Sequence, residues 1–131
     1  MQISLWRHQP FGKRKQSRAR LVSICAAFAG YHLQQAAEKM IKLQIYGSGV
    51  KVDHSKMFRH SLDDLIGYAV SLGIPLYVPS WVNEKKYVIT SWEAEGRYNL
   101  HFVVRMDTLK RCYTELIHWR IQQFPKPASI F

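Results

Sequence analysis

Apolar residues recur every three or four positions along four segments of the chain, which is the pattern of amphipathic helices. The first and longest segment runs from about 16 to 45 and ends at a glycine-rich turn, Tyr46-Gly47-Ser48-Gly49. Its apolar stripe changes face near Gly30, where we expect a bend. The stripe comprises Leu21, Ile24, Phe28 and Tyr31, then Leu33, Ala37, Met40 and Ile41.

Three shorter amphipathic helices are predicted over about 61–72, 80–95 and 107–123. Each begins at a residue whose side-chain oxygen suits an N-cap, namely Ser61, Ser80 and Asp107. Prolines make 74–79 an extended connector, and 96–104 is expected to be a loop or a short turn. The pattern therefore predicts an all-α fold, an antiparallel up-and-down helical bundle of four to five helices.

Composition adds a charge asymmetry to this picture. The 131 residues suit one domain with a net charge of +10. Residues 1–20 contain six basic residues and no acid, so they form a basic N-terminal arm before a bundle over 21–124 and a tail over 125–131. Such an arm favours an anionic partner, RNA or DNA, although a solubilising tail or the edge of a longer protein fits equally.

The rest of the composition bears on the location of the protein and on its need for a metal. No stretch approaches the roughly 20 apolar residues that span a membrane, so we expect no membrane segment. Cys25 and Cys112 lie within apolar helical patterns, which predicts packed free thiols in a reducing, cytoplasmic setting. No pair of histidines or cysteines has a zinc-ligand spacing, and we expect neither a metal nor a cofactor.

The segment 31–42 combines an apolar stripe with a polar strip at helical spacing. The polar residues are Gln35, Glu38, Lys39 and Lys42, beside Leu33, Ala36, Ala37 and Met40. Small alanines allow another helix to approach closely, so the polar strip would line the seam between two helices. Such a seam is a plausible place for a phosphate or a nucleotide.

This segment also resembles the helix that identifies the HEPN family (higher eukaryotes and prokaryotes nucleotide-binding domains). The resemblance lies in an aromatic residue, a Gln-Gln-Ala-Ala-Glu-Lys core and a following lysine. Two further segments are similar to family elements in the same order: 59–65 to a His-x-Leu-x-x-Leu helix opening, and 95–99 to an Ala-Arg-Tyr-Pro element, with Gly for Ala and Asn for Pro. Together they span about 21–122. Family members usually have a full helix before the Gln-Gln helix, whereas here only about 20 residues precede it.

The resemblance implies a helical domain that forms a homodimer and binds a nucleotide, RNA or DNA through its phosphate. It also implies a partner, a minimal nucleotidyltransferase, often within a toxin–antitoxin pair. The residues expected to shape the site are Gln35, Lys39, Lys42, His60, Arg97 and Tyr98. For His60 a structural role is the stronger prediction, with its ring bonded to the backbone at the helix start. Arg97 is equally compatible with an ion pair to a carboxylate such as Glu38, and the Arg-Tyr variety of the family is regarded as non-catalytic.

Two other functions remain open. Some HEPN proteins are metal-independent endoribonucleases, in which an arginine stabilises charge at phosphorus and a histidine moves a proton. Two pairs come near the family's spacing, in which four to six residues separate the arginine from the histidine. Arg97 and His101 have three residues between them, and Arg111 and His118 have six. Alternatively, the motif residues only hold the bundle and its dimer together, as in a structural interaction domain.

Overall fold

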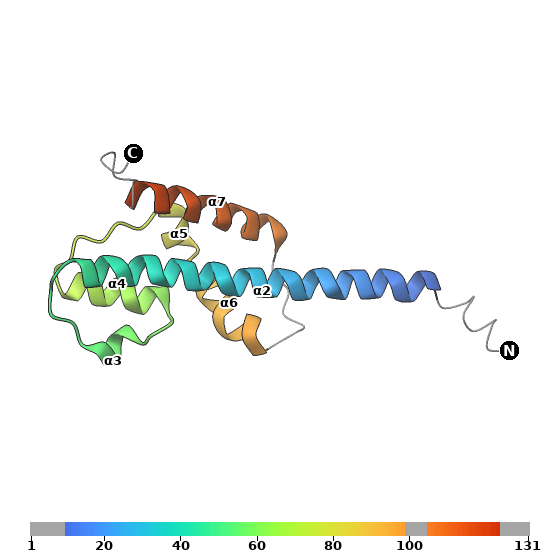
Figure 1. The fold of residues 1–131 in the computed structure, drawn as a ribbon, viewed down its shortest axis with the longest axis horizontal. Helices are drawn as coiled ribbons and strands as arrows, with labels where there is room; N and C mark the ends of the chain where they lie inside the picture. Colours follow the sequence, from blue (N-terminus) through green and yellow to red (C-terminus); the bar gives the residue numbers. More distant parts are fainter. Residues whose placement is uncertain (1–9, 99–104, 124–131) are drawn as a thin grey trace, which may run out of the picture.

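The protein folds into a bundle of helices, with no strand in the part of the chain that is described. The computed structural model describes residues 10–98 and 105–123; most side chains of 10–23 and all those of 94–98 lie outside that description. The elements are α2 (Pro10–Gly47), α3 (His54–Met57), α4 (Leu62–Ser71), α5 (Ser80–Glu84), α6 (Lys86–Tyr98) and α7 (Met106–Gln123) (Figure 1). The predicted all-α class is confirmed, and the short helices α3 and α5 add to the expected number.

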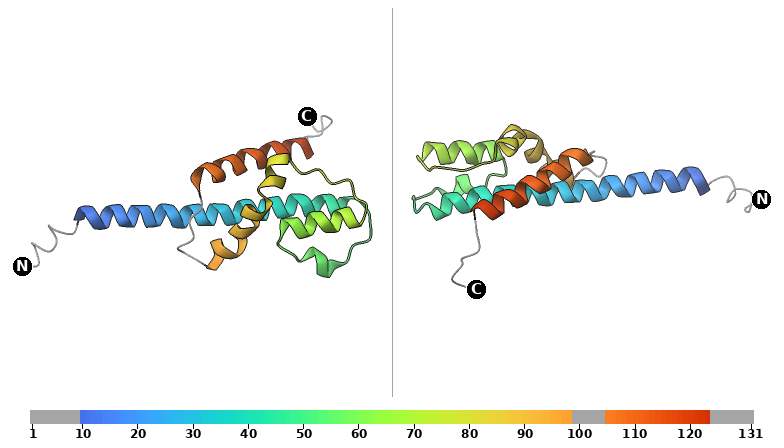
Figure 2. Two further views of the ribbon diagram at one scale, coloured as in Figure 1. Left: turned by 180° about the vertical axis from the view of Figure 1, so that it is seen from behind. Right: turned by 90° about the horizontal axis from the view of Figure 1, so that it is seen from above.

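Helix α2 is the axis of the molecule. Its 38 residues make it about 57 Å long at 1.5 Å per residue, and it contacts α4, α6 and α7. It begins at Pro10, a residue well suited to a first helical turn, so residues 10–20 of the basic arm belong to the same helix as the Gln-Gln motif. The N-terminal part of α2 extends past all the other helices (Figures 1 and 2).

Gly30 serves close packing in place of the expected bend. Helix α2 continues through this position without interruption. A Cβ placed on Gly30 would lie 3.2 Å from the indole ring of Trp92 in α6, a tighter approach than side chains normally make. Glycine therefore lets α6 come close enough to α2 to bury the tryptophan, which is 2% exposed.

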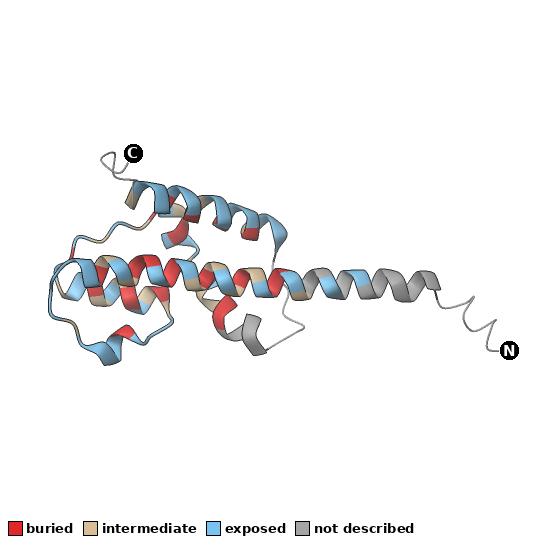
Figure 3. Cartoon of the chain, in the orientation of Figure 1, coloured by how far each residue is buried: buried red, intermediate tan, exposed pale blue. Residues whose placement is uncertain are grey.

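The core lies where α2 is flanked by α4, α6 and α7, and Figure 3 shows its buried residues on their facing sides. It contains two buried indoles, Trp92 and Trp119, so these aromatic rings pack the interior. Tyr87 and Tyr113 are exposed instead. The other fully buried large side chains include Ile41, Ile45, Leu62, Leu65, Ile89 and Val82.

The two cysteines differ in environment. Both are free thiols, but only Cys112 is packed in the core, whereas Cys25 is exposed on α2. Burial, followed by the nearby charge of Glu115, raises the pKa of the Cys112 thiol to about 12.

The start of α4 is tied to α6 by local and tertiary contacts. Ser61 is the N-cap of α4, as predicted, and its hydroxyl accepts a hydrogen bond from the Asp64 amide at 3.3 Å. The Leu62 amide donates to the hydroxyl of Thr90 at 3.1 Å. Lys86 forms an ion pair with Asp63 at 2.7 Å, and its ammonium holds the pKa of Asp63 below the ordinary value of 3.8.

The third predicted helix is split in the structure. Pro79, and not Ser80, occupies the N-cap position of α5, and Lys85 separates α5 from α6. Helix α6 continues to Tyr98, so the segment 96–98 is helical where a loop was expected. Helix α7 begins one residue before the predicted cap Asp107.

Candidate functional site

The Gln-Gln motif places a buried carboxylate on the side of α2 that faces α4. Glu38 is only 4% exposed, and Gln34, one turn earlier, is fully buried. An ionised carboxylate removed from water is strongly unfavourable unless it is paired and hydrogen-bonded. The partners of Glu38 therefore determine whether this buried carboxylate is stable.

Glu38 has three partners, which come from both sides of the α2–α4 contact. One carboxylate oxygen, Oε1, lies 2.8 Å from Nδ1 of His60 and accepts from the amide of Gln34 at 3.3 Å. The other, Oε2, accepts from the ammonium of Lys42 at 3.2 Å. We call Gln34, Gln35, Glu38, Lys42 and His60 the Glu38 cluster.

Gln34 fixes the position of the loop that carries His60. Its amide nitrogen donates to the His60 carbonyl at 2.9 Å, and its amide oxygen accepts from Gln35 at 2.8 Å. The His60 ring thus bonds to Glu38 and not to the backbone of the helix start, which was the expected role. Because both the ring and the carbonyl of His60 are held, the segment before α4 is anchored to α2.

The cluster has its acid inside and its bases outside. The side chain of Glu38 is 5% exposed, that of Lys42 is 19% exposed and that of His60 is 51% exposed. With Glu38 ionised, Nδ1 of His60 donates to it, which leaves Nε2 as the ring nitrogen for another group. An approaching ligand meets cationic and neutral donors first, an arrangement suited to an anion.

A small polar hollow lies at α4 and the segment before it. It has a volume of about 170 Å³ and is lined by Lys56, Arg59, Asp64, Tyr68 and Ser71. Arg59, adjacent to His60 in the chain, is half exposed and pairs with Asp64 at 3.6 Å. The hollow is smaller than the roughly 300 Å³ typical of small-molecule pockets, so it fits a single anionic group better than a whole nucleotide.

The other predicted ligand residues lie apart from the cluster or outside the description. Lys39 follows Glu38 directly, so it is rotated by about 100° around α2 and is exposed on another face. Arg97 and Tyr98 are in the last turn of α6, but their side chains are outside the described residues. Gln35, Lys42 and His60 are therefore the predicted residues that the structure brings together.

Sequence reasoning underrated the two residues at the centre of the cluster. The pattern did not single out Gln34, and it placed Glu38 in the polar strip and as a partner for Arg97 without indicating that Glu38 is buried. A signal was nevertheless present, since Gln34, Glu38 and Lys42 are spaced four residues apart and follow the helix toward its buried side. What could not be read is that α4 covers this side.

Neither proposed ribonuclease pair is assembled among the described residues. His101 lies outside them, so its pairing with Arg97 stays a prediction. In α7, Arg111 donates to Glu115 at 2.8 Å and lies over the Trp81 ring at 5.7 Å, while His118 is exposed two turns farther along. Two turns separate the pair by about 10.5 Å along the axis, and the Arg111 guanidinium is engaged with Glu115 instead of lying beside His118.

The described residues contain neither a grouped set of metal ligands nor a membrane-spanning helix. Within 10–98 and 105–123, no three metal-binding side chains are grouped as a metal site would require. Across the same ranges, no helix is both long enough and apolar enough to cross a membrane.

Comparison with known proteins adds no relative to this description. No family model, no curated protein and no solved structure matches the chain. The resemblance to the HEPN family therefore rests on the three quoted motifs, and the Glu38 cluster connects two of them because it joins the Gln-Gln helix to the His60 segment.

Proposed function

We propose that this protein is a HEPN-like domain that binds the phosphate of a nucleotide or a nucleic acid. The observation that carries the proposal is the Glu38 cluster, in which a buried carboxylate orients a lysine and a half-exposed histidine toward solvent. Arg59, the residue before His60 in the chain, adds a further cation at a separate small hollow. A phosphate bound at either place would receive charge-assisted hydrogen bonds, which are stronger than those between neutral groups.

The basic character of α2 supports a polyanion over a free nucleotide. The whole chain carries a charge of +10, and helix α2 contains seven basic residues against one acid. A nucleic acid gains affinity from every phosphate that such a surface neutralises, through release of condensed counterions. The expected partner is thus RNA or DNA, with the Glu38 cluster as a defined contact within a wider electrostatic footprint.

A homodimer and a minimal nucleotidyltransferase partner belong to this proposal through the family resemblance alone. The resemblance is to the Arg-Tyr variety of the family, which is regarded as non-catalytic. In the proposed role the protein binds and does not cleave.

The test is binding of a labelled mixed-sequence RNA, in buffer without metal, to matched lysine variants. Lys42→Met removes a cluster lysine, and Lys39→Met removes the same charge from the same helix outside the cluster. We expect Lys42→Met to weaken binding about tenfold or more, as for loss of a charge-assisted bond, and Lys39→Met to weaken it about twofold. His60→Gln should behave like Lys42→Met.

Thermal unfolding of each variant separates a lost contact from a lost fold. If the two lysine substitutions weakened RNA binding equally, the binding would depend on overall charge and not on the Glu38 cluster. If the wild-type protein did not shift the RNA at all, the proposal would be refuted. RNA cleavage by the wild-type protein, seen on the same gels, would instead favour the ribonuclease alternative.

A further inference from the structure

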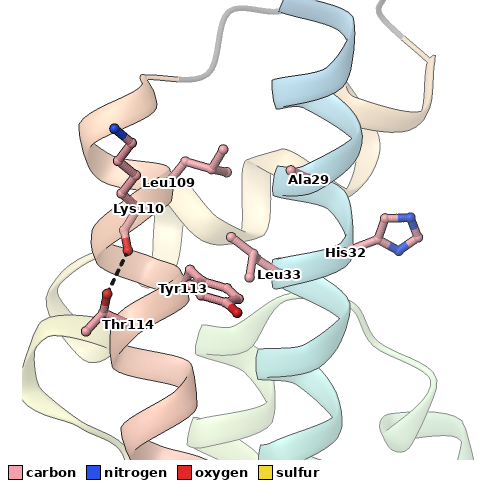
Figure 4. Close-up of a pocket in the computed structure, with 7 residues that line it drawn as sticks. All are labelled: Ala29, His32, Leu33, Leu109, Lys110, Tyr113 and Thr114. Carbon is pink, nitrogen blue, oxygen red and sulfur yellow. Dashed lines mark hydrogen bonds between the residues drawn. The ribbon is translucent and has the colours of Figure 1, made fainter. Parts of the chain in front are cut away.

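A second surface lies between α2 and α7. It is a groove of about 530 Å³ lined by Ala29, His32, Leu33, Leu109, Lys110, Tyr113 and Thr114. In Figure 4, Leu109 and Tyr113 of α7 point toward Ala29 and Leu33 of α2, whereas the polar ends of His32 and Lys110 point away. The interior of the groove is thus apolar, and its polar groups are at the rims.

Exposed apolar residues continue the groove along both helices. On α2, Leu21, Cys25 and Phe28 lead toward His32 at intervals of three or four residues, and Leu21 is 62% exposed. On α7, Tyr113 is followed by Ile117 and Ile121 at intervals of four, and Ile121 is 59% exposed. Exposed apolar side chains therefore leave the hollow along α2 toward its N-terminal end and along α7 toward its C-terminal end. The hollow itself is the seat that an amphipathic helix occupies in helix-in-groove recognition.

Charge around this seat specifies what can occupy it. Lys110 lines the groove, Arg18 and Lys39 are exposed farther along α2, and the only acid of α2, Glu38, is buried and paired elsewhere. The two acids of α7 are already engaged, Asp107 with Arg105 and Glu115 with Arg111. A second copy of this chain would bring the same cations against one another, whereas an acidic partner would be attracted.

We propose that the α2–α7 groove is the docking site for an acidic amphipathic helix of a partner protein. Apolar side chains of that helix, one per turn, fill the space between Leu33 and Tyr113, and its carboxylates face Lys110 and Lys39. The groove is separate from the phosphate site, because Leu33 and Glu38 are five residues apart and so point about 140° apart around α2. The inference goes beyond the proposed function and does not depend on it.

The test uses two labelled helical peptides as long as α7, 18 residues, with leucines at three-four spacing. One has glutamates at the remaining positions and the other has lysines. Fluorescence anisotropy should show the acidic peptide binding at low salt and the lysine peptide not binding. Tyr113→Asp places a like charge in the groove and should weaken acidic-peptide binding about tenfold or more, as loss of a central aromatic contact does.

Tyr87→Asp is the matched control, because Tyr87 is 66% exposed and Tyr113 is 58% exposed, but Tyr87 lies on α6 outside the groove. This variant should bind the peptide as wild type does, and the melting temperature of each variant shows that it is folded under the binding conditions. Equal binding of both peptides, equal effects of both substitutions, or no binding of the acidic peptide would overturn the proposal. A dimer seen by sedimentation velocity and abolished only by Tyr113→Asp would overturn it too, because the groove would then bind a second copy of the chain. RNA binding abolished only by Tyr113→Asp would do the same, because the groove would then bind nucleic acid.

Discussion

Replacing Glu38 with glutamine tests whether the buried carboxylate organises the α2–α4 contact. The substitution keeps the shape of the side chain and removes its charge. A glutamine oxygen can still accept at one position, but its NH₂ group then faces a donor at the other, either the Lys42 ammonium at the 3.2 Å position or the Gln34 amide, which donates to the oxygen beside the His60 ring. At least one charged hydrogen bond is lost and one polar group is left poorly paired.

The expected cost follows from the burial of the group. A hydrogen bond to a charged group contributes about 1.5–3 kcal/mol, and the partners here are partly exposed, which reduces the penalty toward the lower end. We therefore expect Glu38→Gln to lower the free energy of unfolding by about 2 kcal/mol. Lys39→Gln, an exposed neighbour on the same helix, should change it by less than about 0.5 kcal/mol.

Urea unfolding followed by tryptophan fluorescence measures this change at neutral pH, where the buried Trp92 and Trp119 report on the core. A double-mutant cycle with His60→Ala isolates the pairwise coupling, which should fall between about 0.5 and 3 kcal/mol. If Glu38→Gln were no more destabilising than Lys39→Gln, or the coupling were zero, the cluster would not hold the two helices together and the reasoning would be wrong.

Three further results are expected. Gly30→Ala should destabilise the protein by up to about 2 kcal/mol despite alanine's better helix propensity, because the Trp92 indole has no room to move. Gly67→Ala, with open space around its Cβ position, should instead stabilise the protein by about 0.5–1 kcal/mol. Melting curves of the two variants measure this difference. Lys86 lowers the folded-state pKa of Asp63 below 3.8, so their ion pair stabilises the fold above that pH and is lost as the pH falls further. Asp63→Asn should therefore be less stable than wild type at pH 7 and equally stable at acid pH. A constant difference in stability across this pH range would contradict the prediction. Iodoacetamide at pH 8 should label exposed Cys25 and spare buried Cys112, and a mass increase of two labels on the native protein would show that the core opens.

Local features of the fold could be predicted because they depend on residues within one or two helical turns. The three-four spacing identified the long first helix, the helix that opens at Ser61 and the final helix, and the Ser61 cap is present as expected. The break at Lys85 was missed, as was the short helix α3, because neither has a strong periodic signal. The predicted bend was missed because the role of Gly30 depends on Trp92, which lies more than sixty residues away.

The chemistry of the candidate site divides in the same way. The sequence alone determined the helical register of the Gln-Gln motif, the basic character of α2 and the presence of a His60 segment just before α4. Only the tertiary structure decided that Glu38 is buried against that segment while Lys39, one residue later, faces water. It also decided that α7 lies beside α2 and leaves an apolar groove between them. The physical reason is that propensity and capping act within a turn, whereas burial, pairing of charges and grooves are properties of surfaces brought together from distant parts of the chain.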